Sequence, residues 1–413
     1  IQDPTGLEYT ITMAIKELAE EPRAIGVVTG HEGPTLEEGL GGLRDSLPTY
    51  TLEGVNASEE IDPDLAALLI IGPETAFTET ELRRIDQYVM RGGSLGVFGG
   101  NTKLTLQGPE PAVEASDTGL NDLLTKYGVR LGSDIVFDAQ CSRAPWRHPS
   151  GLQMAVQYPP VPILAFDDEQ QEHPATFRIR TAVLPFTSSL EVTTAPEGVS
   201  VEVLGRSSEN SWREAAGTSL AVRHPSQWQL GSDSGPFPLL IAVNGHLPSA
   251  YANAPDVSEP GGPSQIEAPA RAEHDARLFV AGTAAFMRDE FLPQAQPGQP
   301  RDLSGALSFA LNAIDWLAAD SDLIAIRAKN IEDPVIEVPA VQSAEEEIRA
   351  AVEEQDEAEV DEGLERRKEA IAAWDSKKSA YRWLNTLGIP FVFGIFGFVR
   401  WRQRTHKRKN LKL

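Results

Sequence analysis

The chain has a single cysteine, Cys141, among its 413 residues. One cysteine excludes an internal disulfide framework and a metal site built from several thiolates. The chain also has no Gly-x-x-x-x-Gly-Lys-Ser/Thr motif, the glycine-rich loop that holds nucleotide phosphates. It therefore cannot hydrolyse ATP by a P-loop mechanism.

Basic residues are scarce compared with acidic ones. The chain has 36 Lys and Arg side chains and 61 Asp and Glu side chains, which gives a net charge of −25. Seven of the basic residues lie between Arg400 and the C-terminus, where no acidic residue occurs, so the rest of the chain carries about −32. A body this acidic repels phosphates, which argues against nucleic acid as a partner.

One long uncharged run lies near the C-terminus. Residues 384–399 are 16 residues without a charge, about 24 Å as a helix, which is short for a bilayer core of about 30 Å. Extension to 381–401 gives 21 residues and about 31 Å, with aromatic residues at both ends as in membrane spans. We therefore predict a transmembrane helix at 381–401. The residues predicted to anchor it are Tyr381, Trp383, Pro390, Phe391, Phe393, Phe396, Phe398, Trp401, Arg402 and Arg404.

The basic tail sets the predicted orientation of this helix. Lys and Arg next to a membrane span stay in the cytoplasm, so residues 402–413 are expected inside and the acidic body outside. This predicts a single-pass protein of the bacterial inner membrane, with its bulk in the periplasm and its C-terminus in the cytoplasm. A buried core helix is the alternative, whereas an interfacial helix is disfavoured because residues 391–399 are apolar on all sides.

Residues 24–149 alternate short apolar runs with amphipathic patterns. The apolar runs include AIGVV, LAALLII and SLGVF, and the helical patterns cover 36–47, 78–93 and 120–128. Thr78 and Glu81 have the spacing of a capping box, and Gly92-Gly93 is expected to end that helix. Continuous apolar strands between such helices predict a doubly wound, flavodoxin-like parallel sheet.

The rest of the chain divides by composition. We expect a lead-in helix over 1–23, a β-rich insertion with a flexible loop over 150–275, and a return to the α/β core over 276–330. The start Ile1-Gln2-Asp3-Pro4, without a Met or a signal peptide, is interpreted as processed or truncated. Residues 331–380 are predicted to form an acidic linker and a helical stalk; a solvated linker without a stalk is the alternative.

Polar loops follow three of the predicted strands, and parallel strands would bring them to one edge of the sheet. This edge is the candidate contact site for a ligand or partner, and its residues are Thr29, Gly30, His31, Glu32, Gly72, Pro73, Glu74, Gly99, Gly100 and Asn101. The first loop, TGHEGPT, offers free N–H groups to an anion. It contains no nucleophile–base pair, and a purely structural turn is the alternative that we favour for it.

Catalytic, metal and cofactor sites are not predicted. Cys141 and His148 lie seven residues apart, but nothing around them resembles a nucleophile elbow, so a Cys–His hydrolase is only an alternative. The remaining histidines are scattered and lack the spacing of metal ligands.

An ordered series of segments resembles the auxiliary, GldG-like proteins of ABC transporters, a family first associated with gliding motility. The series begins with TGLEYTITMAIKELA, GVVTGHEGPTLEEGLGGL and LLIIGPETAFTETELRRIDQYVMRGGSL, and continues with RLFVAGTAAFM and LNAIDWLAADSDLIAIRAKN. The resemblance covers about residues 6–330 together with the membrane anchor. The chain departs from the family in reading Gly-His-Glu-Gly in its first turn and in lacking an upstream half.

The resemblance implies a non-catalytic, glutamine-amidotransferase-like or flavodoxin-like domain outside the inner membrane. Its implied partners are an ABC-2-type permease and a cytoplasmic ATPase, and a separately encoded upstream GldG-like half is a further candidate. The expected role is to bind or gate a substrate or partner. The alternatives are a structural envelope adaptor of a motility or secretion machine and a tethered amidotransferase-like hydrolase that uses His31, Glu32 and Cys141.

Overall fold

The computed structural model divides into two compact units, Ile1–Glu332 and Asp333–Leu413. The structure describes residues 22–105, 111–147, 153–177, 179–228, 231, 233–252, 269–292 and 305–318 of the first unit. In the second unit it describes residues 343, 366, 368–370, 372–374, 376–377, 398 and 400–402, all of them helical.

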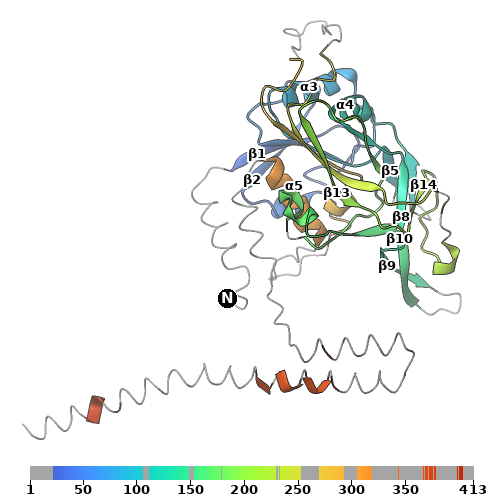
Figure 1. The fold of residues 1–413 in the computed structure, drawn as a ribbon. Coiled ribbons are helices and arrows are strands. Elements are labelled where there is room, and N and C mark those ends of the chain that lie inside the picture. The colour runs from blue at the N-terminus through green and yellow to red at the C-terminus, as the bar shows by residue number, and fades with distance from the viewer. Residues whose placement is uncertain are drawn as a thin grey trace, which may run out of the picture. The chain divides into compact units, whose positions relative to one another are not determined.

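A seven-stranded sheet forms the centre of the first unit (Figure 1), with the strand order β13-β15-β16-β4-β3-β1-β2. All neighbours from β16 to β2 are parallel, whereas β15 pairs antiparallel with both β16 and β13. The sheet is therefore mixed, with its antiparallel part at one edge. In the same order its strands are Val199–Arg206, Pro238–Gly245, Ala276–Ala281, Leu95–Phe98, Ala67–Ile71, Arg23–Val28 and Tyr50–Val55.

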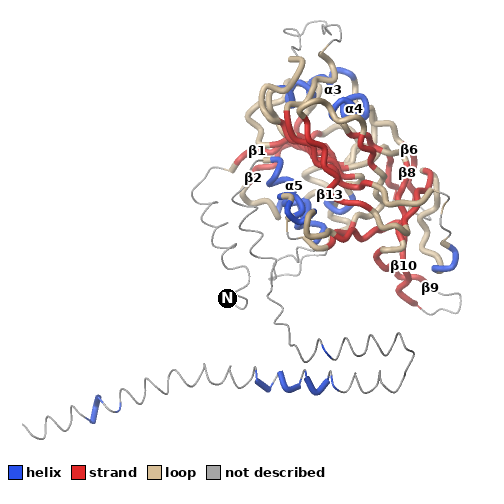
Figure 2. The backbone as a smooth tube through the Cα atoms, in the orientation of Figure 1, coloured by secondary structure: helices blue, strands red, loops and turns tan. Residues whose placement is uncertain are grey.

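Apolar clusters cover both faces of this sheet, because successive side chains of a strand point to opposite faces. In β3, Leu68 and Ile70 join one cluster while Leu69 and Ile71 join the other. Figure 2 shows the strands in the middle, with helices beside them. The first cluster includes residues of α3 (Glu79–Met90) and α4 (Leu120–Tyr127), and the second includes residues of α2 (Gly41–Asp45) and α5 (Gly305–Leu317).

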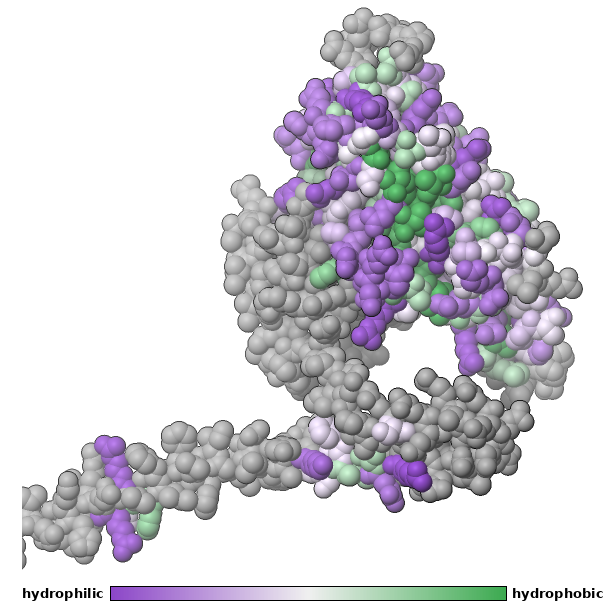
Figure 3. Space-filling view, in the orientation of Figure 1, coloured by the Kyte–Doolittle hydropathy of each residue, from purple (hydrophilic) through white to green (hydrophobic). Residues whose placement is uncertain are grey.

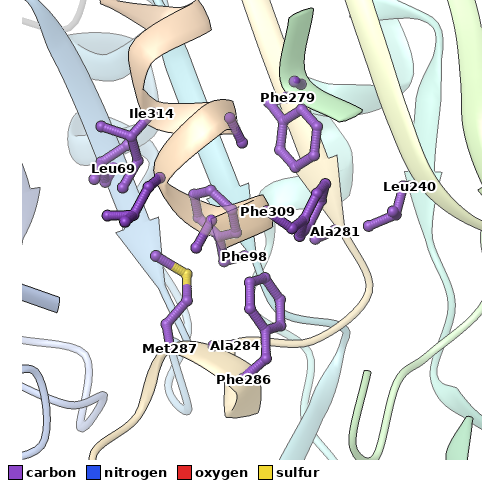
Figure 4. Packing of buried hydrophobic residues seen from close by; sticks show 14 of the residues in the cluster. Leu69, Phe98, Leu240, Phe279, Ala281, Ala284, Phe286, Met287, Phe309 and Ile314 are labelled. Carbon is purple, nitrogen blue, oxygen red and sulfur yellow. The ribbon is translucent and has the colours of Figure 1, made fainter. Parts of the chain in front are cut away.

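Aromatic rings fill the space between α5 and the sheet (Figure 4). The ring of Phe279 lies 5.7 Å from that of Phe98 and 5.6 Å from that of Phe309 on α5. Phe286 also packs on Phe309, at 5.6 Å between ring centroids. Rings at these separations and tilts combine burial with favourable edge and face contacts, so they fix α5 on this face.

The other strands form small sheets beside the main one, and a third apolar cluster connects two of them, β5–β6 and β8–β14. This cluster consists of Val113, Ile135, Phe137, Trp212 and Leu220. The pairs are β5 (Thr102–Thr105) with β6 (Ala112–Ala115), β7 (Val129–Leu131) with β12 (Leu190–Val192), and β8 (Asp134–Asp138) with β14 (Ser211–Ala215), and the three-stranded sheet contains β9 (Cys141–Arg147), β10 (Gln153–Ala165) and β11 (Thr181–Val183). Short 3-10 helices cover Gln170–Glu172, Pro174–Thr176, Pro225–Gln227 and Ala285–Met287.

The start of α3 confirms the predicted capping box. The backbone N–H and the hydroxyl of Thr78 each donate to the Glu81 carboxylate at 2.7 Å, and the Glu81 N–H donates back to the Thr78 hydroxyl at 3.3 Å. Gly92, just past the helix, has a φ of 94°, which only glycine adopts without strain. The helix therefore ends where the sequence predicts.

The predicted helix over 36–47 is wrong for its first part. Only α2, five residues long, is helical there, and Thr35 instead forms a bridge with Gly39. Gly39 has a φ of 98°, so the chain turns out of the helical conformation at this glycine. The apolar residues that suggested the helix, Leu36, Leu40, Leu43 and Leu47, are nevertheless all buried.

Most of the membrane-related predictions fall on residues outside the described part. The lead-in helix over 1–23, the stalk, and the anchor residues Tyr381, Trp383, Pro390, Phe391, Phe393, Phe396 and Arg404 lie wholly or mainly there. Phe398 and Trp401 are helical and are 59% and 62% exposed. Among the described residues, none of the helices has the length and apolar character needed to span a bilayer.

The face seen in Figure 3 is mainly hydrophilic, in keeping with the charged composition of the chain. A hydrophobic area interrupts it near the position of β13 in Figure 1. Val199, Val201 and Val203 of β13 are half-buried and pack against the cluster that includes α3 and α4. The edge of the sheet thus leaves part of its apolar surface open to solvent.

Candidate functional site

The loops that follow the parallel strands do meet at one edge of the sheet. β1, β3 and β4 end at Val28, Ile71 and Phe98, directly before the three predicted loops. A fourth loop, residues 282–285, follows β16 and is not among the predicted ones. The signal that could have found it is Gly282-Thr283 directly after the buried run of β16.

His31 in the first loop is held inward rather than presented to solvent. Its side chain is 8% exposed, and its ring stacks on Phe77 with 3.7 Å between centroids. The backbone carbonyl of His31 accepts the N–H of Glu74 at 2.8 Å, which ties the first loop to the second. His31 Nε2 lies 3.6 Å from Oε1 of Glu81, the capping-box partner of Thr78 in the first turn of α3. His31 therefore joins the turn to the start of a helix.

Gly33 and Gly72 close the space between the ends of β1 and β3. A Cβ atom on Gly33 would lie 2.7 Å from the Gly72 carbonyl oxygen and 2.8 Å from that of Ile71, which are distances that real Cβ atoms do not show. Only glycine permits this approach of the two backbones. What remains is a small depression lined by Thr29, Gly30, His31, Pro73, Phe77 and neighbouring residues.

Lys103 connects the charged groups at the rim of this edge. Its ammonium nitrogen lies 2.9 Å from Glu74 Oε2 and 3.1 Å from Glu32 Oε2. Hydrogen bonds to Glu74 and then to Glu32 raise the pKa of Lys103 above its ordinary value. Glu32, 62% exposed, sits in the left-handed region at a φ of 56°. The rim is therefore an ordered, solvent-facing set of charges.

A segment of the predicted insertion covers the ends of β4 and β16. The Ser188 N–H donates to the Gly282 carbonyl at 2.9 Å, and the Thr283 hydroxyl donates to the Pro185 carbonyl at 2.7 Å. A Cβ on Gly100 would overlap the Ser188 hydroxyl. Asn101 turns away from this edge, since its N–H donates to the Gly132 carbonyl at 3.0 Å and its side-chain oxygen accepts the Thr118 hydroxyl at 2.9 Å.

Apart from Asn101, the predicted contact residues thus lie together, but they leave little open space between them. Gly72, Glu74, Gly99 and Gly100 line a second shallow depression, which Thr283 and Arg288 complete. Whether this edge contacts a ligand or a partner stays a prediction.

The environment of Cys141 does not activate its thiol. Burial raises the pKa of the Cys141 thiol, whereas a nucleophilic cysteine has a lowered pKa. His148, its suggested base, lies outside the described residues.

His173 is structural: burial lowers the pKa of His173 to about 4, and its Nδ1 accepts the Ala175 N–H at 3.1 Å. Within the part of the chain that the structure describes, no group of three or more His, Cys, Asp or Glu side chains could hold a metal ion.

Comparison with known protein families assigns the chain to one family. The sequence profile of the family ABC_transp_aux, described as "ABC-type uncharacterized transport system", matches residues 22–313. The chain belongs to this family. The match covers the main sheet, both helical layers and all four loops of the carboxyl edge, so the resemblance to auxiliary proteins of ABC transporters is confirmed. It supports an accessory role in transport and association with transporter components in general.

Two solved structures are similar to the chain at low sequence identity. The N-terminal domain of mmIFT52 is 15% identical, with a TM-score of 0.42, over 71% of this chain and 97% of that one. A putative ThuA-like protein from Parabacteroides merdae is 10% identical, with a TM-score of 0.34, over 72% of this chain and 90% of that one. None of the curated proteins compared with the chain matches it.

Proposed function

We propose that the chain is a membrane-anchored accessory subunit of an ABC-2-type transporter complex, which acts outside the inner membrane by binding or gating a substrate or partner protein without catalysis. The family match over residues 22–313 carries this proposal. The geometry of the carboxyl edge supports it, because Gly33, Gly72 and Ser188 fill the space between the strands while Glu32 and Lys103 remain at the rim. Such an edge suits contact with a protein surface better than enclosure of a small substrate.

We also propose that the parallel part of the sheet is flavodoxin-like. Its strand order is β2-β1-β3-β4-β16, which corresponds to the order 2-1-3-4-5 of that class. The order reverses between β1 and β3, which is where such proteins hold ligands, and Gly33 and Gly72 occupy this position here. The proposed contact surface at the rim therefore lies at the position where flavodoxin-like proteins bind their ligands, but it would bind a protein surface there instead.

Topology provides the first test of this proposal. Protease added to intact spheroplasts is expected to remove the acidic body, because the basic tail holds residues 402–413 in the cytoplasm. Immunoblots with tags at residue 1 and residue 413 would follow the two ends. Full protection of the body would overturn the extracytoplasmic location.

Copurification provides the second test. The full chain, extracted in detergent, is expected to bring down a permease and an ATPase, and Lys103→Glu is expected to lower their yield about tenfold because it places three carboxylates together at the rim. Lys126→Glu, at an exposed position of α4, is the matched control and should leave the yield unchanged. Migration of the wild-type chain as a lone monomer would contradict the subunit role; an unchanged yield with Lys103→Glu would contradict contact through this edge.

A further inference from the structure

A larger concavity lies beside the carboxyl edge, between β7, β12, β8 and β14. Its volume is about 480 Å³, within the range of small-molecule sites in proteins. Asn101, after β4, forms one wall of it. Its polar lining includes Asn101, Arg130, Asp134, Ser189, Glu191 and Arg213.

One wall of this pocket is held rigidly. The Asp134 carboxylate accepts the N–H of Ser189 at 2.9 Å with one oxygen and the Ser189 hydroxyl at 2.7 Å with the other. A Cβ on Gly132 would lie 2.7 Å from the Ser189 carbonyl and 2.8 Å from Asp134 Oδ1. Glycine at 132 therefore allows the two segments to approach and fixes the carboxylate before any ligand arrives.

Two guanidinium groups face this wall. Arg213 donates to Asp233, lies over the Phe237 ring at 4.8 Å, and places Nη1 3.6 Å from Asp134 Oδ2. At that last distance the two groups form an ion pair, and both line the pocket. Arg130 is exposed and lies directly opposite Glu191 in the β7–β12 pair.

Asn101 adds a neutral donor to this set. Its side chain is 8% exposed, and its side-chain oxygen already accepts the Thr118 hydroxyl. The amide NH₂ of Asn101 is thus left to donate to a ligand. A donor at the pocket wall favours a ligand that can accept its hydrogen bond.

The charges of the lining identify the class of ligand. Two guanidinium groups and two carboxylates sum to zero, so an anion would meet Asp134 and Glu191, and a cation would meet Arg130 and Arg213. Hydroxyl groups both donate to carboxylates and accept from guanidinium groups, and adjacent hydroxyls can do so in pairs. We propose that this pocket binds a neutral carbohydrate. The site goes beyond the proposed accessory role, and either can fail without the other.

Binding of defined sugars tests the proposal. Saturation-transfer NMR and titration calorimetry on the detergent-extracted full chain would use glucose, N-acetylglucosamine and maltose at millimolar concentrations. At least one is expected to bind, and Arg130→Ala and Glu191→Gln should each weaken its binding about tenfold, since each removes a hydrogen bond to a charged group. Both side chains are exposed, so the fold should survive their replacement.

The matched control is Arg143→Ala, an exposed arginine of β9 outside the pocket, which should leave binding unchanged. Glycine and inorganic phosphate serve as the zwitterionic and anionic probes. No binding of any of the three sugars would overturn the proposal, and so would preferred binding of glycine or phosphate. Sugar binding that neither Arg130→Ala nor Glu191→Gln weakens would also overturn it, because the sugar would then bind elsewhere.

Discussion

Replacement of Asp86 by alanine is expected to lower the free energy of unfolding by about 3 kcal/mol. The Asp86 carboxylate is fully buried and accepts three hydrogen bonds, from the Tyr127 hydroxyl at 2.8 Å, the Ser249 hydroxyl at 2.7 Å and the Ala250 N–H at 2.9 Å. These donors come from α4 and from the segment after β15, so one side chain of α3 joins three parts of the chain. Alanine would leave the buried Tyr127 hydroxyl and the two half-buried donors of residues 249 and 250 without this acceptor.

Denaturant-induced unfolding of the full chain, followed by tryptophan fluorescence, would measure this loss. Glu53→Ala, at an exposed position of β2, is the matched control and should change the free energy of unfolding by less than about 0.5 kcal/mol. Equal effects of the two substitutions would show that the buried carboxylate contributes no more than a surface one.

The pH dependence of stability gives an independent readout of Asp86. Burial raises the pKa of Asp86 above the ordinary value of 3.8, against the hydrogen bonds that lower it. The folded protein therefore binds this proton more tightly than the unfolded chain, and the free energy of unfolding falls as pH rises from 3.8 through the higher folded pKa. Asp86→Asn should remove this part of the pH dependence.

Replacement of Gly282 by alanine is expected to lower the free energy of unfolding by about 2–3 kcal/mol. A Cβ atom there would overlap the carbonyl oxygen of Ser188 and lie 2.6 Å from the Thr187 hydroxyl. Because the nearest atom belongs to the backbone, a side-chain rotation cannot relieve the overlap. The segment that covers β16 would have to move, and the hydrogen bond from the Ser188 N–H would weaken.

The same unfolding measurement tests this prediction, with Gly217→Ala as the control. Gly217 has a φ of 97°, and a Cβ there would meet nothing within 4 Å, so only the backbone conformation opposes the substitution. About 1 kcal/mol is expected for such a change. A loss at Gly282 no larger than at Gly217 would mean that the covering segment adapts freely.

Local patterns account for the parts of the fold that the sequence predicts. The buried runs of β3 and β4 and the capping box of α3 each depend on residues close together in the chain. Pairing between distant segments is different. The apolar run of β8 is a strand that pairs with β14 outside the main sheet, and β13 and β15 join that sheet in antiparallel orientation. The residues of a strand do not reveal which distant strand it pairs with.

In the candidate site too, some features follow from local sequence patterns and others depend on contacts between distant residues. Parallel strands bring Gly30, Gly72 and Gly99 to one edge, and this follows from the strand pattern alone. The close contact of Gly33 with Gly72, and the bridge from Lys103 to two glutamates, depend on distances of a few ångströms that no spacing reveals. The pocket beside Asn101 is also invisible in the sequence, because its walls combine residues before position 135 with residues of the predicted insertion that are distant in the chain.

The pairing of β4 with β16 has a consequence for how the protein folds. Leu95 and Leu278 are partners in this pair although 183 positions separate them. Until β16 has been synthesised, β4 presents an open edge and an uncovered apolar face, which is the condition in which nascent chains aggregate. Contacts of such high sequence separation also form slowly. We expect the central sheet to form late, after the intervening strands have begun to fold. We also expect a chaperone to bind the nascent chain before β16 pairs with β4.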